Sequence, residues 1–205
     1  MLKVILVRHG ETDWNKVRRI QGGGSNTRLN ERGLEQVAWL ADRLRREKLL
    51  AVYSSPLERA LVTARAIADH HSLEVQIEPS LKEIEAGELE GRTVTEVGKH
   101  FSQILIKNLE GETLPQIPGG ESLLEVQQRA WGTIKRLVSQ YSEGAVVVVS
   151  HYFVILSVIC AALEIPLAQI VRFRLTTGTI SAIDFDDGAA RLSAFNEGVG
   201  KGVVG

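Results

Sequence analysis

Two histidines in the sequence stand directly after short apolar runs. His9 follows "LKVILV" with Arg8 between them, and His151 follows "AVVVVS". A neutral imidazole can act as a nucleophile near neutral pH. A guanidinium keeps its charge, and its planar fork suits phosphate or carboxylate oxygens. Either histidine alone is as compatible with a half-buried structural role, but the arginine beside His9 indicates chemistry on an anion.

Two further residues extend this pattern. Arg59 lies just inside the first turn of a predicted helix, where free N–H groups and the helix dipole already favour an anion. Asn15 is a neutral hydrogen-bond donor shortly after the first apolar run. Two arginines, two histidines and an asparagine at one edge of a sheet would form an oxyanion pocket. Phosphate is the occupant that these residue types favour.

Other chemistries find no support in the sequence. It contains no GxxxxGK[ST] loop for a nucleotide and no HExxH, and its Cys and His spacings do not form a zinc site. The glycine-rich stretch "QGGGSN" lacks the spacing of a dinucleotide fingerprint, and no serine lies in a GxSxG elbow. We therefore expect neither a metal site nor a cofactor.

The apolar runs predict the strands that position these residues. Strand candidates are "LKVILV", "LLAVYSS", "LEVQIEP", "AVVVVS" and "TISAIDF", and "FDDGAARLSAF" predicts a hairpin that turns at Asp187-Gly188. Helical patterns alternate with these strands. The alternation predicts an α/β fold, a three-layer sandwich whose largely parallel central sheet is flanked by helices.

Capping residues predict where the helices begin. Asn30 is a candidate N-cap, Ser55 with Glu58 predicts a capping box, and Ser122 with Glu125 predicts another. A helix that is apolar nearly all round should follow His151 and be buried. Ligands of open α/β sheets bind at the carboxyl ends of the strands, so the sequence places both strand-end histidines at the binding edge.

Composition limits the classes of partner. Hydrophobic residues make up 44% and charged residues 24%, and the net charge of -1 gives no drive toward nucleic acid or a membrane surface. The one cysteine, Cys160, excludes an intrachain disulfide and suits a buried thiol in a reducing compartment. No apolar run is long enough for a signal peptide or a membrane span. We expect a cytoplasmic protein with one domain over 1–196 and a disordered tail over 197–205.

At this point the motifs carry a family resemblance. "LVRHGETDWN" resembles the signature of the histidine phosphatase superfamily, in the branch with phosphoglycerate mutases and small-molecule phosphatases. Further blocks resemble that family in the same order along the chain: "RIQG" with "LNERGLEQ", "VYSSPLERALVTA", "LKEIEAGELEG", "PGGES" and "VVVVSH". Six ordered blocks are far more specific than a single RHG.

The resemblance implies a role for each matching residue. His9 matches the nucleophile that becomes transiently phosphorylated, and Glu83 matches the acid that protonates the leaving oxygen. Only the resemblance selects Glu83 among four nearby acids, since Glu85, Glu88 and Glu90 have the same side chain. The residues matching phosphoryl-binding positions are Arg8, Asn15, Arg59 and His151, where His151 is either charged or neutral. Those matching the substrate side are Gln21 and Gly22.

The chain also departs from the family pattern. Tyr152 stands where glycine is usual after the second histidine, so its ring either packs into the core or lines the leaving-group pocket. The usual acidic residue and proline of the "QG" block are replaced by Asn26 and Arg28. Four basic residues of this region form either a substrate-steering rim or a solvated loop: Lys16, Arg18, Arg19 and Arg28.

These observations predict a metal-independent phosphatase that hydrolyses a small phosphomonoester through a phosphohistidine. The first alternative is a phosphoglycerate mutase that depends on a bisphosphorylated cofactor, although the short chain favours hydrolysis. A non-catalytic phosphate-binding module is the second alternative. The expected partner is a small phosphorylated metabolite, without nucleic acid or membrane, and the expected state is a monomer or homodimer.

Overall fold

A six-stranded sheet forms the centre of the fold in a computed structural model that describes residues 1–97 and 117–199. Its strand order is β3-β2-β4-β1-β5-β6. The strands are β1 (Leu2–Arg8), β2 (Leu49–Ser54), β3 (Val75–Ile77), β4 (Gly144–Ser150), β5 (Thr179–Asp186) and β6 (Ala189–Gly198). The first four are parallel to one another, whereas β5 runs antiparallel to β1 and pairs with β6 as a hairpin.

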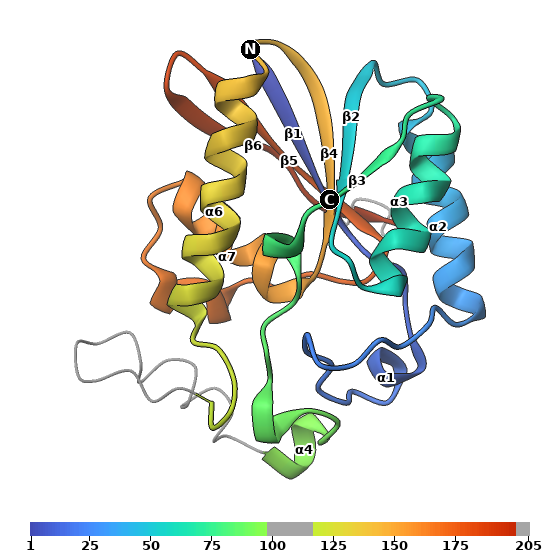
Figure 1. The fold of residues 1–205 in the computed structure, drawn as a ribbon, viewed down its shortest axis with the longest axis vertical. Coiled ribbons are helices and arrows are strands. Elements are labelled where there is room, and N and C mark those ends of the chain that lie inside the picture. The colour runs from blue at the N-terminus through green and yellow to red at the C-terminus, as the bar shows by residue number, and fades with distance from the viewer. Residues whose placement is uncertain (98–116, 200–205) are drawn as a thin grey trace, which may run out of the picture.

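Helices cover both faces of the sheet, which confirms the predicted three-layer α/β fold. On one face lie α2 (Glu31–Leu44) and α3 (Glu58–Asp69), and on the other lie α6 (Leu123–Gln140) and α7 (Tyr152–Ala162) (Figure 1). Short helices occupy the connections: α1 (Asp13–Lys16), α4 (Val94–Val97), and the 3-10 turns η1 (Pro79–Leu81), η2 (Gly87–Leu89) and η3 (Leu167–Arg172).

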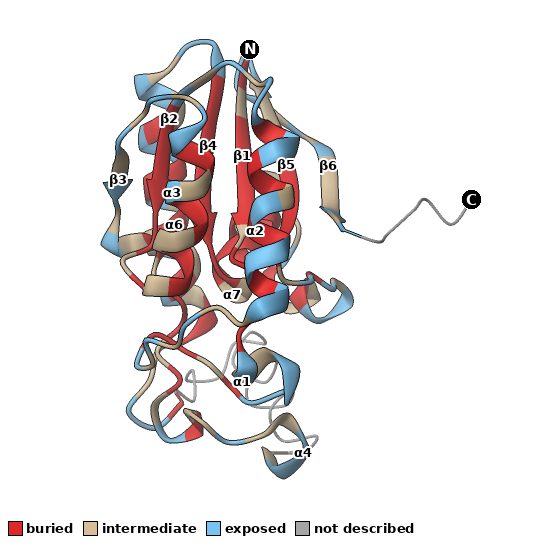
Figure 2. Ribbon diagram, turned by 90° about the vertical axis from the view of Figure 1, so that its right-hand side faces the viewer, coloured by how far each residue is buried: buried red, intermediate tan, exposed pale blue. Residues whose placement is uncertain are grey.

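Strand β1 shows why its sequence is almost continuously apolar. Val4 and Leu6 belong to the core cluster on the α6 and α7 side, whereas Ile5 and Val7 belong to the cluster on the α2 and α3 side. Successive side chains of a strand point to opposite faces, so a strand covered on both faces needs apolar residues throughout. The central strands are accordingly buried along most of their length (Figure 2).

Two of the three predicted helix caps are confirmed. The Asn30 side chain accepts a hydrogen bond from the Gly33 N–H at the start of α2, and Ser122 forms a capping box with Glu125 at α6. The capping box predicted at Ser55 is wrong. Helix α3 begins at Glu58 after Leu57, which provides no side-chain cap, because the Ser55 hydroxyl lies two residues too early and contacts His151 instead.

The C-terminal strand corrects the predicted tail. The hairpin turn at Asp187-Gly188 is confirmed, with φ angles of 45° and 82°. Strand β6 then continues through Gly198, which pairs with Thr179, so the tail boundary predicted after 196 is two residues too early. Residues 200–205 of that tail lie outside the described structure. Within the described ranges, none of the helices has the length and apolar character needed to cross a bilayer.

Candidate active site

A cavity of about 1150 Å³ opens at the carboxyl ends of β1 and β4, the edge that the sequence predicts for a ligand. The short helices α1 and α4 lie beyond this end of the sheet (Figure 1). The predicted site residues that line the cavity are Arg8, His9, Asn15, Gln21, Gly22, Glu83 and Tyr152. The other two, Arg59 and His151, are fully buried behind it.

His9 is held in one tautomer at the end of β1. Its Nδ1 lies 2.7 Å from the carbonyl oxygen of Gly10. A carbonyl only accepts hydrogen bonds, so Nδ1 carries the proton and Nε2 keeps a free lone pair. Burial, followed by the charges of Arg59 and Arg8, holds the pKa of His9 well below its usual range. The imidazole is therefore neutral and nucleophilic at neutral pH.

The glycine after His9 is required by the packing of the loop that follows. A Cβ on Gly10 would lie 2.5 Å from the carbonyl oxygen of Gly33, an approach that no other residue tolerates. This contact brings the N-terminal turn of α2 against the end of β1. It also fixes the carbonyl that orients the His9 ring.

Arg59 supplies one of the two positive charges beside His9. It is the second residue of α3, and its guanidinium donates to the carbonyl oxygens of Ser25 at 2.8 Å and Gly22 at 3.1 Å. With the Gln21 amide oriented to satisfy both its ends, its oxygen accepts from Arg59 Nε at 2.6 Å. Burial lowers the pKa of Arg59 to about 10, which leaves the guanidinium charged at neutral pH.

Arg8 supplies the second charge and is placed by two neighbours. Its guanidinium donates to the carbonyl oxygen of Leu175, and its Cζ lies 5.1 Å from the centre of the Tyr152 ring. Cation–π contact of this kind favours a fixed guanidinium plane. The buried Nε of Arg8 has no hydrogen-bond partner among the described residues. Burial lowers the pKa of Arg8, but the group stays protonated.

Tyr152 both lines the cavity and packs against the core, and its role toward a leaving group stays a prediction. It is the first residue of α7, lines the cavity and packs edge-on against Phe153 with ring centres 5.1 Å apart. Its hydroxyl donates to the carbonyl oxygen of Phe173 at 3.1 Å. The ring therefore forms part of the cavity wall and also contacts the core. The sequence did not predict its contact with Arg8.

Glu83 is the one of the four neighbouring acids that lines the cavity. Its side chain is buried, and desolvation raises the pKa of Glu83 above its usual range. The other three acids have other surroundings: Glu85 pairs with a lysine at 2.6 Å, Glu88 is exposed, and Glu90 accepts from the Gly22 N–H at 3.0 Å. Burial thus distinguishes Glu83, whose carboxyl can hold a proton, from the other three acids. The sequence alone could not make this distinction.

Asn15 and the basic residues near it are placed at the mouth of the cavity. The Asn15 Oδ1 accepts from the Thr12 N–H at 3.1 Å as part of the α1 capping box, so its amide nitrogen is the group left to donate. Arg18 and Arg19 also line the cavity. Of the other two basic residues predicted for a rim, Arg28 pairs with Glu58 at 3.2 Å and Lys16 does not line the cavity.

His151 faces His9 with ring centres 5.0 Å apart. Its Nε2 lies 2.7 Å from the Ser55 hydroxyl, and its buried Nδ1 has no partner in the described part of the chain. Burial, followed by the charge of Arg59, lowers the pKa of His151 well below its usual range. The possible positive charge considered for His151 is therefore not favoured in the free protein. Sequence reasoning missed Ser55, because it assigned that hydroxyl to a helix cap.

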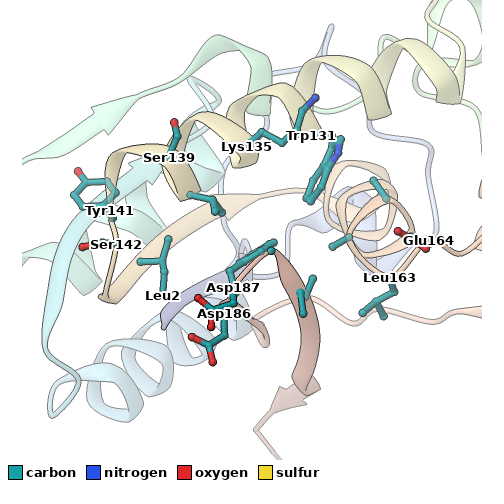
Figure 3. A pocket seen from close by; sticks show the side chains of 17 residues that line it. Leu2, Trp131, Lys135, Ser139, Tyr141, Ser142, Leu163, Glu164, Asp186 and Asp187 are labelled. Atoms are coloured by element: carbon teal, nitrogen blue, oxygen red, sulfur yellow. The ribbon is translucent and has the colours of Figure 1, made fainter.

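A second cavity, of about 770 Å³, lies among α6, the end of α7 and the β5–β6 hairpin (Figure 3). Trp131, Lys135 and Asp186 are among its lining residues, and Asp186 pairs with the N-terminal amine at 3.5 Å. It contains none of the predicted site residues. Among residues 1–97 and 117–199, no group of three or more His, Cys, Asp or Glu side chains is arranged to hold a metal ion.

Comparison with known proteins agrees with this geometry. The chain is 36% identical over 187 residues to phosphoserine phosphatase 1 of Hydrogenobacter thermophilus, covering 91% of this chain and 88% of that protein. It is 33% identical to the probable phosphoglycerate mutase GpmB of Yersinia pestis, covering 91% and 86%. The crystal structure of a mutant phosphoserine phosphatase from Entamoeba histolytica in complex with phosphoserine superposes with a TM-score of 0.86 at 31% identity, covering 96% of this chain and 98% of that one.

The family assignment covers nearly the whole described chain. Residues 4–198 match the histidine phosphatase superfamily, branch 1. The match begins in β1, ends in β6 and includes all the predicted site residues. The chain therefore belongs to branch 1 of the histidine phosphatase superfamily.

Proposed function

We propose that the protein is a phosphatase that hydrolyses a small phosphomonoester through a phosphohistidine at His9. The observation that carries this proposal is the neutral His9 ring, with its Nδ1 proton committed to Gly10 and its Nε2 lone pair free beside two guanidinium groups. A nucleophile in this state attacks phosphorus without first losing a proton.

The first step transfers the phosphoryl group to the enzyme. The Nε2 lone pair of His9 forms a bond to phosphorus, and the ester P–O bond breaks with its electron pair on the leaving oxygen. Glu83 gives its proton to that oxygen, so an alcohol departs and a carboxylate remains. The raised pKa of Glu83 favours the protonated form that this step needs.

The second step releases phosphate. Water attacks phosphorus and gives a proton to the Glu83 carboxylate, while the N–P bond breaks and returns its electron pair to His9. Phosphoryl transfer depends mainly on positioning and charge neutralisation. Arg8 and Arg59 are charged at neutral pH and would neutralise the phosphoryl oxygens, so the proposed reaction uses no metal ion.

Phosphatase and mutase differ only in what accepts the phosphoryl group. Water accepts it in a phosphatase, whereas a hydroxyl of a bound phosphorylated acid accepts it in a mutase. A relative named as a phosphatase and a relative named as a probable mutase are both similar to this chain. We favour hydrolysis because the phosphatase relative is 36% identical to this chain over 187 residues and the mutase relative 33%, and similar solved structures include further phosphatases.

A substrate panel tests the proposal. Phosphoserine and 3-phosphoglycerate, which solved relatives contain, belong in it beside sugar phosphates and p-nitrophenyl phosphate. We expect phosphate release from at least one physiological ester, equal with and without EDTA. Interconversion of phosphoglycerates that requires a bisphosphorylated cofactor, without phosphate release, would identify a mutase instead. Binding of phosphate with neither activity would identify a binding module.

Two broader expectations stay predictions. We expect the cytoplasm, because a single cysteine suits a reducing compartment. A monomer or homodimer is expected in solution. Cell fractionation and light scattering would test them.

A further inference from the structure

Ser55 is a fully buried residue just beyond the end of β2, and its hydroxyl contacts the second histidine of the site. Its backbone N–H donates to the carbonyl oxygen of Val149 at 3.0 Å, which fixes it against β4. The Ser55 Oγ then lies 2.7 Å from Nε2 of His151. This distance is that of a direct and well-formed hydrogen bond.

The contacts of the Ser55 hydroxyl favour one direction for this hydrogen bond: its oxygen can accept two hydrogen bonds, but its proton also needs an acceptor. The Leu57 N–H donates to Ser55 Oγ at 3.4 Å, so the oxygen already acts as an acceptor there. A serine hydroxyl has one proton to give, and Nε2 of His151 is the acceptor within reach. If Ser55 donates to Nε2, a neutral His151 must carry its own proton on Nδ1.

The surroundings of His151 Nδ1 are those expected of a hydrogen-bond donor that pairs only when a ligand is bound. It is buried, has no hydrogen-bond partner among the described residues, and its ring lies 5.0 Å from that of His9. A buried polar atom left without a partner is destabilising, so such atoms commonly have a functional reason. A phosphoryl group bonded to His9 would bring acceptor oxygens to this side of the ring.

We infer that Ser55 is a positioning residue that holds His151 in the tautomer with the proton on Nδ1, so that His151 donates to a phosphoryl oxygen as a neutral group. The part of this inference that concerns catalysis rests on the proposed function. The tautomer of His151 and its effect on phosphate binding do not. The opposite tautomer would direct a lone pair at the bound oxygens and weaken binding.

The electrostatics explain why a neutral donor needs such a partner. Burial and the nearby charge of Arg59 disfavour a second proton on His151. An imidazolium would donate from both nitrogens whatever Ser55 did. A neutral imidazole has a single proton, and only a donor at Nε2 ensures that this proton stays on Nδ1.

The direct test is long-range proton–nitrogen NMR of the full-length protein with ¹⁵N-labelled histidine near neutral pH. The His151 signals are identified as those missing from His151→Gln. We expect the Nδ1–H tautomer in the wild-type protein. A dominant Nε2–H tautomer, or a doubly protonated ring, would overturn the inference without need of any Ser55 variant.

Variants then test the consequence for binding. In Ser55→Ala we expect inorganic phosphate to bind about ten- to hundredfold more weakly by calorimetry, by analogy with the loss of the hydrogen-bond partner of a metal-binding histidine. The NMR signature of His151 should shift toward the other tautomer. Ser54→Ala is the matched control, because Ser54 is equally buried and donates only to the Ser55 carbonyl at 2.9 Å. Ser55→Thr, which keeps the hydroxyl, should restore most of the affinity.

These outcomes separate the inference from the proposed function. Unchanged phosphate affinity in a folded Ser55→Ala would overturn the inference even if the enzyme is a phosphatase. The predicted tautomer and the predicted loss of affinity would support it even if no ester in the panel is hydrolysed.

Discussion

The rings of His9 and His151 lie 5.0 Å apart, inclined by 57°, and each is hydrogen-bonded through a different nitrogen. The Nδ1 of His9 is bound to a carbonyl, which frees Nε2 as a nucleophile. The Nε2 of His151 is hydrogen-bonded to a hydroxyl, and its buried Nδ1 has no partner among the described residues. In the proposed mechanism these two identical side chains have different roles, because the neighbour of each determines which nitrogen holds the proton.

Glu83→Gln tests the acid. We expect it to slow esters of basic alcohols by about 100-fold or more, because an alkoxide leaves poorly without a proton. Hydrolysis of p-nitrophenyl phosphate should slow much less in its first step, since nitrophenolate leaves with little help. Steady-state kinetics on both substrates checks this, with the exposed Glu88→Gln as control. Equal losses on both substrates would remove Glu83 from the role of acid.

Tyr152 variants test the wall of the cavity. Tyr152→Phe keeps the ring under Arg8 and loses one hydrogen bond, so we expect a loss of about 1 kcal/mol in stability and nearly unchanged kinetics. Tyr152→Gly should lower the free energy of unfolding by about a few kcal/mol, because it removes an aromatic ring that packs against the core. It should also accept bulkier leaving groups, because the same ring limits the space in the cavity. Melting temperature and a substrate panel check both variants. A panel unchanged in Tyr152→Gly would show that the ring is structural only.

The two buried histidines give stability a pH dependence of known sign. In the unfolded chain a histidine titrates near pH 6.5, whereas burial lowers the pKa of both His9 and His151 well below that in the folded protein. Below about pH 6.5 the unfolded chain therefore binds more protons at these two histidines than the folded protein does. The contribution of the two histidines to the free energy of unfolding should therefore be largest above this pH and fall as the pH drops toward their folded pKa values, whereas the raised pKa of Glu83 contributes with the opposite sign.

Denaturant unfolding between about pH 7.5 and pH 5.5 measures this slope. In His9→Gln the slope should decrease, because one of the two groups no longer titrates. His70→Gln is the control for substituting an exposed histidine outside the site. A slope equal in all three proteins would contradict the assigned pKa direction.

The apolar strands and the edge that they present were predictable from sequence because both depend on local patterns. A run such as "LKVILV" needs cover on two faces, and the residue that follows it must lie at the carboxyl edge. Arg8, His9 and His151 were therefore placed correctly. The extension of β6 to Gly198 was missed because its glycines resemble a flexible tail, whereas pairing with Thr179 decides the outcome.

The parts of the site that the sequence could not predict depend on contacts between distant segments. Glu83 differs from Glu85 in burial, which no local pattern encodes. The Ser55 hydroxyl had a local explanation as a helix cap, and only the fold brings His151 within reach, 96 residues away in the chain. The protonation state of His151 likewise depends on its burial and on Arg59, which come together only in the folded protein.

His9→Ala should remain folded and lose several orders of magnitude in turnover, because the covalent step has no other nucleophile. The melting temperature and circular dichroism check folding. A folded variant that kept a tenth of wild-type activity would show that His9 is not the nucleophile.

Rapid quenching at alkaline pH during the first turnover of p-nitrophenyl phosphate, followed by peptide mass spectrometry, tests the phosphohistidine most directly. The good leaving group makes the first step fast, so the phosphorylated enzyme should accumulate with a burst of nitrophenolate. We predict one phosphoryl group on the peptide that contains His9, absent from His9→Ala. Release of nitrophenolate with that peptide unmodified throughout, or with the phosphoryl group on another residue, would contradict the proposed mechanism.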